Sequence, residues 1–358
     1  MDPLTQGLLG ATAAQNLSPP RRHAAAATAL GFLSGMAADL DVLIRSSEDA
    51  LLFLEYHRQF THSLIFIPLG ALLCASVLQL LLARIWPLSF FRSTLYCAAG
   101  YATHALLDAC TTYGTQLLWP FSDARIAWNV LSIIDPLYTL PIAALVLLAQ
   151  RGQRRWAARA ALCWALSYPL LGLVQRERAE TAGWALATSR DHHPETVEAK
   201  PSFANLLLWK TVYRDNGYFY VDAVRVGRQP QIYTGDAIAA LDPARDLAWL
   251  PHDSRQAQDV ARFQWFSKGY TALQPGDPLR IIDIRYSILP HELDALWSIR
   301  LYPQHPERGV DYQTHRNSTN KSALLWQMLM GRELPAPPTA AAVATAKTQA
   351  APPASGPL

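Results

Sequence analysis

Apolar segments separated by short polar connections fill the first half of the chain, whereas the second half alternates between apolar and polar positions. The main apolar segments are residues 24–38, 63–86, 93–110, 131–150 and 157–175, and a shorter one covers residues 2–18. Two of them approach the roughly 20 residues that cross a bilayer, and the others are shorter or interrupted by polar groups. The pattern predicts a mainly α-helical protein with a polytopic transmembrane helical bundle over residues 1–175.

The composition changes after Gln175. Residues 176–200 are polar and predict a linker. Strand-like stretches follow at 218–226, 261–266 and 280–287, separated by Gly, Pro and Asp residues that favour turns. We therefore expect a smaller α+β or β-rich extramembrane domain over residues 201–334. Residues 335–358 are mostly Ala, Pro and Thr, which predicts a disordered tail.

Overall composition supports a membrane protein and argues against nucleic acid as a partner. Of the 358 residues 51% are hydrophobic and only 16% are charged, and the net charge of +3 is small and diffuse. The cysteines, Cys74, Cys97, Cys110 and Cys163, fall in or beside the apolar segments and form no CxxC pair. A disulfide framework or a thiolate zinc site is therefore not expected.

The basic residues predict an orientation. Arginines occur in alternate connections, and the positive-inside rule assigns these connections to the cytoplasm. They are Arg21, Arg22, Arg84, Arg92, Arg151, Arg154, Arg155 and Arg159. The remaining connections and the C-terminal domain then face outward. Arg21 and Arg22 before an alanine-rich run also resemble the start of a signal peptide, but the apolar residues that precede them favour a retained helix.

Acidic residues and histidines gather at the outward ends of the apolar segments, and this is the chain's strongest chemical signal. They are Asp39, Asp41, His57, His62, His104 and Asp108. His104 and Asp108 are four residues apart and share one helix face. Taken singly, each has an ordinary interpretation: a hydrogen-bonded helix pair, the polar end of a helix, or an interfacial histidine. Ionisable groups at membrane depth need partners, however, and a bound cation would supply one for all of them.

Imidazole and carboxylate ligands without thiolates suit zinc, manganese, iron or magnesium, so we expect a divalent metal ion of undetermined identity. One ion or a close pair requires that Asp39, His62 and Asp108 lie within about 10 Å of one another. Arg58 is predicted to hold an anionic substrate group, although an interfacial contact with lipid phosphate is an equal alternative. Asp135 precedes Pro136 and is predicted either as a general base or as an ordinary helix start.

Several short motifs together resemble one known family. They are Met1-Asp-Pro-Leu-Thr, Asp39-Leu-Asp41, His57-Arg-Gln-Phe-Thr-His-Ser63, His104-Ala-Leu-Leu-Asp-Ala-Cys-Thr-Thr112 and Ser132-Ile-Ile-Asp-Pro-Leu-Tyr138. Their order and spacing resemble the membrane-bound metal-dependent hydrolases, the YdjM-like proteins linked to LexA regulation in some bacteria. The resemblance implies a bacterial inner-membrane protein whose metal ligands are the six residues named above. Many relatives have a histidine where this chain has Gln6, and a glutamine carbonyl is a weaker ligand.

The function expected from these observations is hydrolysis by metal-activated water at the outer face of the membrane. A membrane site beside an arginine favours membrane lipid as the partner and an amphiphilic or phosphate-bearing substrate, such as a lipid-linked phosphate. Two alternatives remain open at this stage. The cluster could belong to an ion-coupled or proton-coupled transporter, or the metal could be structural in a non-catalytic membrane protein.

Overall fold

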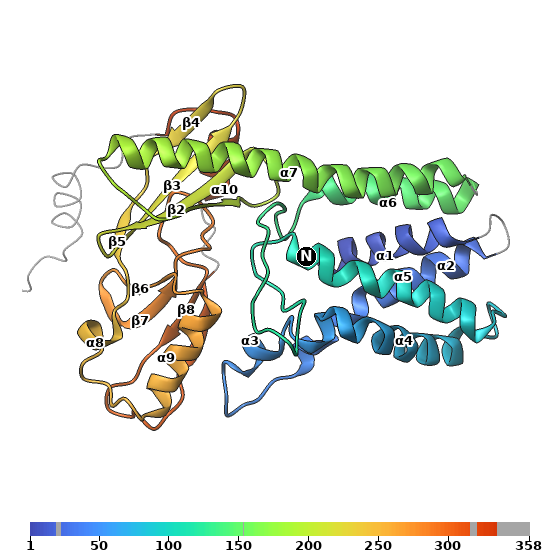
Figure 1. The fold of residues 1–358 in the computed structure, drawn as a ribbon, viewed down its shortest axis with the longest axis horizontal. Coiled ribbons are helices and arrows are strands. Elements are labelled where there is room, and N and C mark those ends of the chain that lie inside the picture. Colours follow the sequence, from blue (N-terminus) through green and yellow to red (C-terminus); the bar gives the residue numbers. More distant parts are fainter. Residues whose placement is uncertain (19–22, 153, 316–320, 335–358) are drawn as a thin grey trace, which may run out of the picture.

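The computed structural model describes residues 1–18, 23–152, 154–315 and 321–334. Helices fill the first half (Figure 1). They are α1 (Pro3–Leu17), α2 (Ala24–Ala37), the 3-10 turn η1 (Ala38–Leu43), α3 (Leu52–Tyr56), the 3-10 turns η2 (Phe60–His62) and η3 (Leu64–Phe66), α4 (Ile67–Leu82), α5 (Phe90–Ala109), α6 (Pro136–Gly152) and α7 (Arg155–Ser189). Arg21, Arg22 and the predicted tail 335–358 lie outside the described residues.

Three helical segments of the described chain are long and apolar enough to cross a membrane: Ala24–Leu43, Leu64–Leu82 and Arg155–Ser189. A shorter apolar helix covers Pro136–Arg151. Only 17% of the Leu64–Leu82 window is buried inside the protein, and Leu72, Val77 and Leu80 on α4 are exposed. An exposed surface of this kind is costly in water and is ordinary in lipid.

Glycines set the spacing of α1, α2 and α5. A Cβ atom added to Gly31 would lie 2.5 Å from the Gly10 carbonyl oxygen, and one added to Gly100 would lie 2.3 Å from the Gly31 carbonyl oxygen. A Cβ on Gly35 would lie 2.7 Å from the Gln6 carbonyl oxygen. Gly31 and Gly35 form a Gly-x-x-x-Gly pair, a pattern that lets helix backbones approach closely. Where these glycines lie, the backbones of α1, α2 and α5 therefore contact one another directly.

Residues 176–200 are not the predicted linker. Helix α7 continues without interruption to Ser189, and strand β1 (Val197–Pro201) follows after a short turn. The polar composition is that of an amphipathic helix: Arg176 pairs with Glu180 one turn later at 3.5 Å, while small residues on the other face, Ala179, Ala182, Gly183 and Ala187, are buried. Ion pairs between residues four apart stabilise a helix, and so does the burial of small residues along one helix face. Residues 176–189 therefore fold as part of α7.

In its described residues, the C-terminal region contains two antiparallel sheets. The first has the order β1, β2 (Leu208–Asp215), β3 (Tyr218–Val226) and β4 (Pro230–Tyr233), with β5 (Ala237–Ala239) also paired to β3. The second has the order β6 (Thr271–Gln274), β7 (Asp277–Asp283), β8 (Trp297–Arg300) and β9 (Asp311–Thr314). The helices here are α8 (Pro243–Asp246), α9 (Arg255–Phe266) and α10 (Lys321–Leu329). The predicted strand 218–226 coincides with β3.

Residues 261–266, expected as a strand, belong to helix α9. Ser254 caps this helix by accepting a hydrogen bond from the Ala257 amide, and Val260, Phe263 and Phe266 are buried at helical spacing. The three- and four-residue spacing of buried positions outweighs the local β preference of the aromatic residues. The predicted strand 280–287 is only partly correct, because β7 ends at Asp283.

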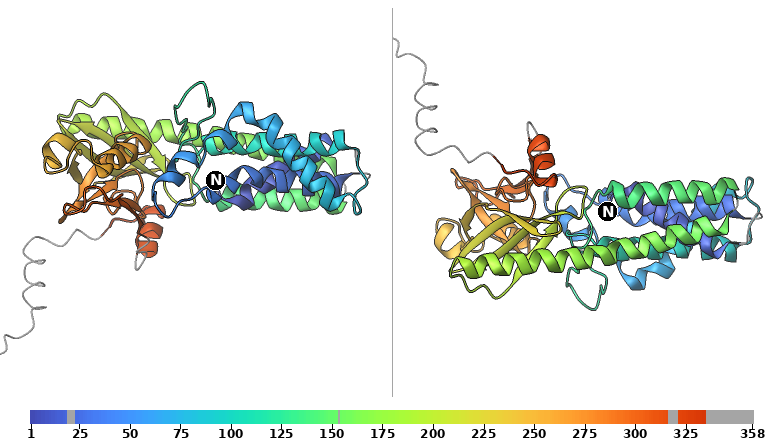
Figure 2. Two further views of the ribbon diagram at one scale, coloured as in Figure 1. Left: turned by 90° about the horizontal axis from the view of Figure 1, so that it is seen from below. Right: turned by 90° about the horizontal axis from the view of Figure 1, so that it is seen from above.

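The helical bundle and the sheets lie at opposite ends of an elongated molecule, and α7 runs along both (Figures 1 and 2). Its C-terminal half contributes Ala179 and Ala182 to the same core as Trp209 and Val224 of the first sheet. A second core joins Leu54 of α3 and Tyr113 to Phe263 of α9 and Ile299 of β8. The two halves therefore share hydrophobic cores, and the loops at the end of the bundle lie between them.

Candidate metal centre

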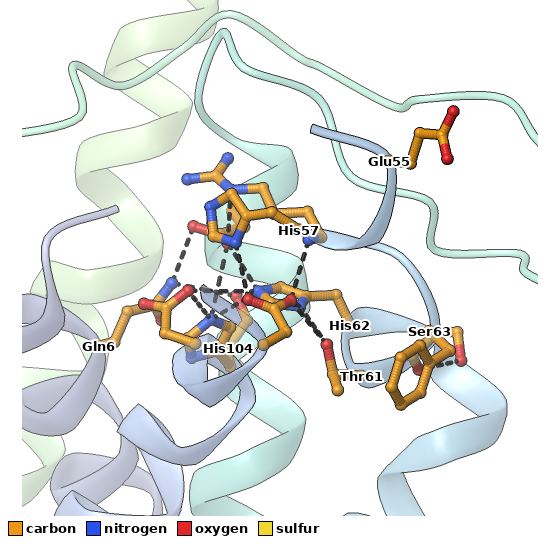
Figure 3. Close-up of polar contacts among 12 residues, drawn as sticks. Gln6, Glu55, His57, Thr61, His62, Ser63 and His104 are labelled. Atoms are coloured by element: carbon orange, nitrogen blue, oxygen red, sulfur yellow. Dashed lines mark hydrogen bonds and ion pairs between the residues drawn. The ribbon is translucent and has the colours of Figure 1, made fainter. Parts of the chain in front are cut away.

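Three separate parts of the chain bring the predicted histidines and aspartates together where the bundle meets the C-terminal sheets. Asp39 and Asp41 lie on η1, His57 follows α3 and His62 ends η2. His104 and Asp108 lie on one face of α5. Figure 3 shows His57, His62 and His104 converging with Gln6 beside them. The distance expected from sequence is met, because ligand atoms of Asp39, His62, His104 and Asp108 all lie within 4.8 Å of one another.

This group of four is compact and buried. His62 Nε2 lies 3.2 Å from Asp108 Oδ2 and 3.5 Å from Asp39 Oδ1, and His104 Nε2 lies 3.6 Å and 3.4 Å from the same two atoms. The side chain of Asp39 is 19% exposed, whereas those of the other three are fully buried. Two imidazole nitrogens and two carboxylate oxygens thus point at one small volume, and of the four side chains Asp39 is the one that reaches solvent.

The outer hydrogen bonds of the two histidines fix which nitrogen faces that volume. His104 Nδ1 lies 2.6 Å from the Gly35 carbonyl oxygen, and His62 Nδ1 lies 2.9 Å from Thr61 Oγ1, whose own proton is donated to Asp41 Oδ2. Since both partners are acceptors, each Nδ1 carries a proton and each neutral ring presents a lone pair at Nε2. The two Nε2 atoms are 2.9 Å apart. Facing lone pairs repel unless a proton or a metal ion lies between them, so the donor set fits a cation.

A second group of possible ligands shares Asp39 with the first. Ligand atoms of Asp39, Asp41 and His57 also lie within 4.8 Å of one another. Asp41 is the most heavily bonded member: its Oδ1 contacts His57 Nδ1 at 2.7 Å, and its Oδ2 accepts hydrogen bonds from the Arg58 amide and from Thr61 Oγ1. Two overlapping groups with one common carboxylate would suit a close metal pair.

Positive and neutral donors also compensate the charge of the Asp108 carboxylate. Arg58 Nε lies 3.1 Å from Asp108 Oδ2, and Gln6 Nε2 donates to Asp108 Oδ1 at 2.9 Å. The backbone nitrogen of Met1 also contacts Asp108. Gln6 therefore touches the centre through Asp108, while its own amide oxygen is buried without a hydrogen-bond partner.

The histidine pKa values show how strongly the cluster stabilises positive charge. Burial lowers the pKa of His62, but hydrogen bonds to Asp108, Asp39 and Asp41 outweigh burial and raise it to about 10. At His57 burial prevails over the hydrogen bond to Asp41, so its pKa is lowered. Positive charge is therefore favoured at His62, within the group of four, rather than at the rim.

Asp135 lies outside both groups. Its Oδ1 accepts hydrogen bonds from the amides of Leu137 and Tyr138 at the start of α6, and the Tyr168 hydroxyl donates to both carboxylate oxygens. These are the bonds of a buried helix cap. The geometry thus matches the helix-start alternative and gives no support to a role as general base.

A cleft of about 880 Å³ opens beside the cluster, lined by Asp39, His57 and Arg58 on one side. Its other walls include Tyr113 and, from the second sheet, Trp297 and Tyr312. The sequence interpretation did not single out these aromatic residues. Tyr113 had a detectable signal, since it stands in a Gly-containing stretch directly after the His104/Asp108 helix, whereas Trp297 and Tyr312 reach the cleft only through tertiary folding.

A buried arginine holds the loop that carries His57. Arg125 Nη2 donates to the carbonyl oxygens of Leu54 at 2.6 Å and His57 at 3.2 Å, and Nη1 donates to that of Gly114 at 3.4 Å. Burial lowers the pKa of Arg125 to about 10. The residue gave no sequence signal, because its hydrogen bonds go to backbone carbonyls of distant residues.

Comparison with known proteins identifies a family and two relatives. A model of the YdjM inner membrane protein family matches residues 1–179. The chain is 22% identical over 278 residues to the uncharacterized protein YfhP of Bacillus subtilis, covering 76% of this chain and 80% of YfhP. It is 32% identical over 128 residues to the inner membrane protein YbcI of Escherichia coli, covering 34% of this chain and 71% of YbcI. No solved structure matches significantly.

Proposed function

The chain belongs to the YdjM inner membrane protein family, and from this premise we propose that it is a metal-dependent hydrolase that spans the membrane several times. The family confirms the resemblance seen in the motifs. The observation that carries the proposal is the convergence of Asp39, His62, His104 and Asp108 around one small buried volume.

The arrangement of the helices supports a multi-pass topology with the site outside. The α4–α5 and α6–α7 connections lie at one end of the bundle, and the sheets lie at the other (Figure 1). Arg84 and Arg154 lie in those two connections and Arg92 lies in the first turn of α5, so the positive-inside rule places this end of the bundle in the cytoplasm. On this proposal the metal centre and the C-terminal sheets are periplasmic, and membrane lipid surrounds the exposed leucines of α4.

The six predicted histidines and aspartates could supply all the protein ligands of one or two metal ions. Asp39, His62, His104 and Asp108 would hold one divalent ion, with zinc, manganese, iron and magnesium all compatible with imidazole and carboxylate. Asp41 and His57 would join Asp39 around a second ion, or act together as a proton-transferring pair if only one ion binds. A divalent ion at such a site supplies Lewis acidity, which lowers the pKa of water and polarises a phosphoryl oxygen.

Arg58 and His57 are the residues of the cleft proposed to bind the substrate and to transfer a proton. Arg58 lies between Asp108 and the cleft, and its side chain lies over the Tyr113 ring at 4.9 Å. A guanidinium in this position suits an anionic group such as a phosphoester. His57, held by Asp41, lines the cleft and is placed to accept or donate a proton. We propose a lipid-linked or otherwise amphiphilic phosphoester as the substrate, because the cleft combines this cation with apolar walls.

The test of the metal centre is elemental analysis of detergent-purified protein, comparing wild type with Asp108→Ala. We expect wild type to retain one or two equivalents of a divalent metal and Asp108→Ala to lose most of it. Asp123→Ala, which removes an exposed carboxylate away from the cluster, serves as the matched control and should retain the metal. Wild-type protein without metal would overturn the proposal.

Activity separates the hydrolase from a structural metal. We expect wild type to hydrolyse bis(p-nitrophenyl) phosphate, to lose activity after chelation and to regain it when the retained metal is restored. The metal is structural if two results occur together. Asp108→Ala, which lacks the metal, would unfold at a much lower temperature than wild type, and wild type would show no hydrolysis of the phosphodiester. Metal uptake into proteoliposomes would point to transport.

A further inference from the structure

The cleft at the metal centre is built by both halves of the molecule. Trp297 on β8 and Thr314 on β9 are paired directly across the second sheet, and both line the cleft together with Tyr312. Asp39 and His57 line its opposite side. A molecule bound at the cluster therefore lies against the edge of the C-terminal sheet.

Aromatic contacts connect this sheet edge to the cluster. The Tyr113 ring lies 5.7 Å from the His57 ring and 5.8 Å from the Trp297 ring, both edge to face. Trp297 also packs against Tyr286 at 4.2 Å. Since aromatic pairs of this kind fix ring orientation, Trp297 has a defined position relative to His57 and Arg58.

The remaining walls of the cleft are aliphatic and lie beside the membrane-length helices. Met36 on α2, Leu40 on η1 and Ile134 before α6 line this part. Leu40 is 64% exposed and Ile134 is 45% exposed. Exposed apolar side chains at the end of membrane-length helices suit the hydrocarbon part of an amphiphile. The sheet edge instead presents aromatic rings and the Thr314 hydroxyl, which suit a polar head group.

We propose that the edge formed by Trp297, Tyr312 and Thr314 is a head-group subsite that selects lipid phosphoesters with a polar, ring-bearing head group. This inference rests on the proposed function, because it places the phosphate beside Arg58 and the metal ligands. The hydrocarbon part then lies toward Met36 and Ile134, and the head group extends outward to the sheet. Trp297, Tyr312 and Thr314 are thus specificity-determining residues contributed by the C-terminal region.

Binding of two short-chain lipids tests the subsite without relying on turnover. Full-length protein in nanodiscs is titrated at 4 °C with dihexanoyl phosphatidic acid, which has no head group beyond phosphate, and with dihexanoyl phosphatidylinositol, which has a ring. Empty nanodiscs provide the blank, and mass spectrometry checks that the lipid stays intact. We expect wild type to bind the inositol lipid about tenfold more tightly.

Two substitutions at the sheet edge act in opposite steric directions. Trp297→Ala removes a ring, and Thr314→Trp fills the subsite from an exposed position. Each is expected to abolish the tenfold preference while changing phosphatidic acid binding less than threefold. Trp326→Ala, on α10 and 63% exposed, is the control and should preserve the preference. Ile134→Asn should weaken both lipids equally.

The outcomes distinguish this inference from the proposed function. Wild-type protein that retains metal but binds both lipids equally overturns the subsite and leaves the metal centre standing. Equal weakening of both lipids by Thr314→Trp also overturns it. Protein without metal contradicts the proposed function, and the lipid preference is still measured independently.

Discussion

At the scale of single residues, the candidate centre depends on what lies behind each ligand. The Gly35 carbonyl orients His104, and Asp41 orients both His57 and His62. Such outer partners set tautomer and ring direction, and in metal proteins their loss typically lowers metal affinity 10-fold to 100-fold. Arg58 adopts a positive φ of 63°, and its amide donates to Asp41, so the His57 turn is a constrained conformation that needs support.

Arg125 supplies that support, which gives the first prediction. Arg125→Met should destabilise the protein by about 3 kcal/mol, because several buried carbonyl oxygens lose their donor at about 1–3 kcal/mol each. We also expect reduced metal retention, since the His57 turn loses its clamp. Thermal unfolding and elemental analysis of the purified variant measure both effects.

Arg308→Met is the matched control for this substitution. Arg308 is exposed and pairs with Asp311 at the surface, where ion pairs contribute about 0–1 kcal/mol. If Arg125→Met is as stable as Arg308→Met and retains the same metal, Arg125 has no positioning role.

At the scale of the elements, backbone contact between helices decides where His104 lies. Gly10 and Gly31 let α1 approach α2, and Gly31 and Gly100 let α5 approach α2. This close approach brings His104 Nδ1 to the Gly35 carbonyl oxygen. The position of a candidate metal ligand is thus set by the absence of side chains several residues away.

The second prediction follows from this packing. Gly31→Val would place carbon atoms within 2.5 Å of Ala14 Cβ and of the Gly10 carbonyl oxygen, a distance that forces α1 and α2 apart. Overpacking of this kind costs roughly 1–3 kcal/mol, and the metal content should fall with it. Ala25→Val, which adds bulk to the exposed face of α2, should leave unfolding temperature and metal unchanged. Normal metal retention in Gly31→Val would contradict the dependence of the centre on helix spacing.

At the scale of the whole molecule, α7 is the element that relates the bundle to the sheets. Its 35 residues correspond to about 50 Å at 1.5 Å per residue, and it contributes to cores at both ends. A continuous helix fixes the distance between the cytoplasmic end of the proposed bundle and the C-terminal region.

The third prediction concerns the proposed topology. In a chain whose four cysteines are replaced by alanine, a cysteine at exposed Asp253 should react with a membrane-impermeant maleimide in intact cells. A cysteine at Arg154 should react only after the membrane is permeabilised. The opposite labelling pattern would reverse the orientation and place the metal centre on the cytoplasmic side.

The sequence interpretation failed where local composition misrepresents three-dimensional surroundings. Residues 176–189 are polar in composition yet form a helix, because their small residues pack on a sheet whose strands come later in the chain. Residues 261–266 have β-prone side chains but bury them at helical spacing. Asp135 matched two patterns, helix cap and catalytic carboxylate, and only the hydrogen bonds of Tyr168, Leu137 and Tyr138 distinguish them.

The sequence by itself determined the apolar helices, the family and the six histidines and aspartates, because hydrophobic runs and ionisable groups at their ends are local features with a direct energetic meaning. Only the tertiary structure decided that four of these residues converge on one volume and that Asp135 does not join them. It alone placed Trp297 and Tyr312 opposite His57. Contacts between residues far apart in the chain depend on helix spacing and shared cores, and neither is encoded in any single segment.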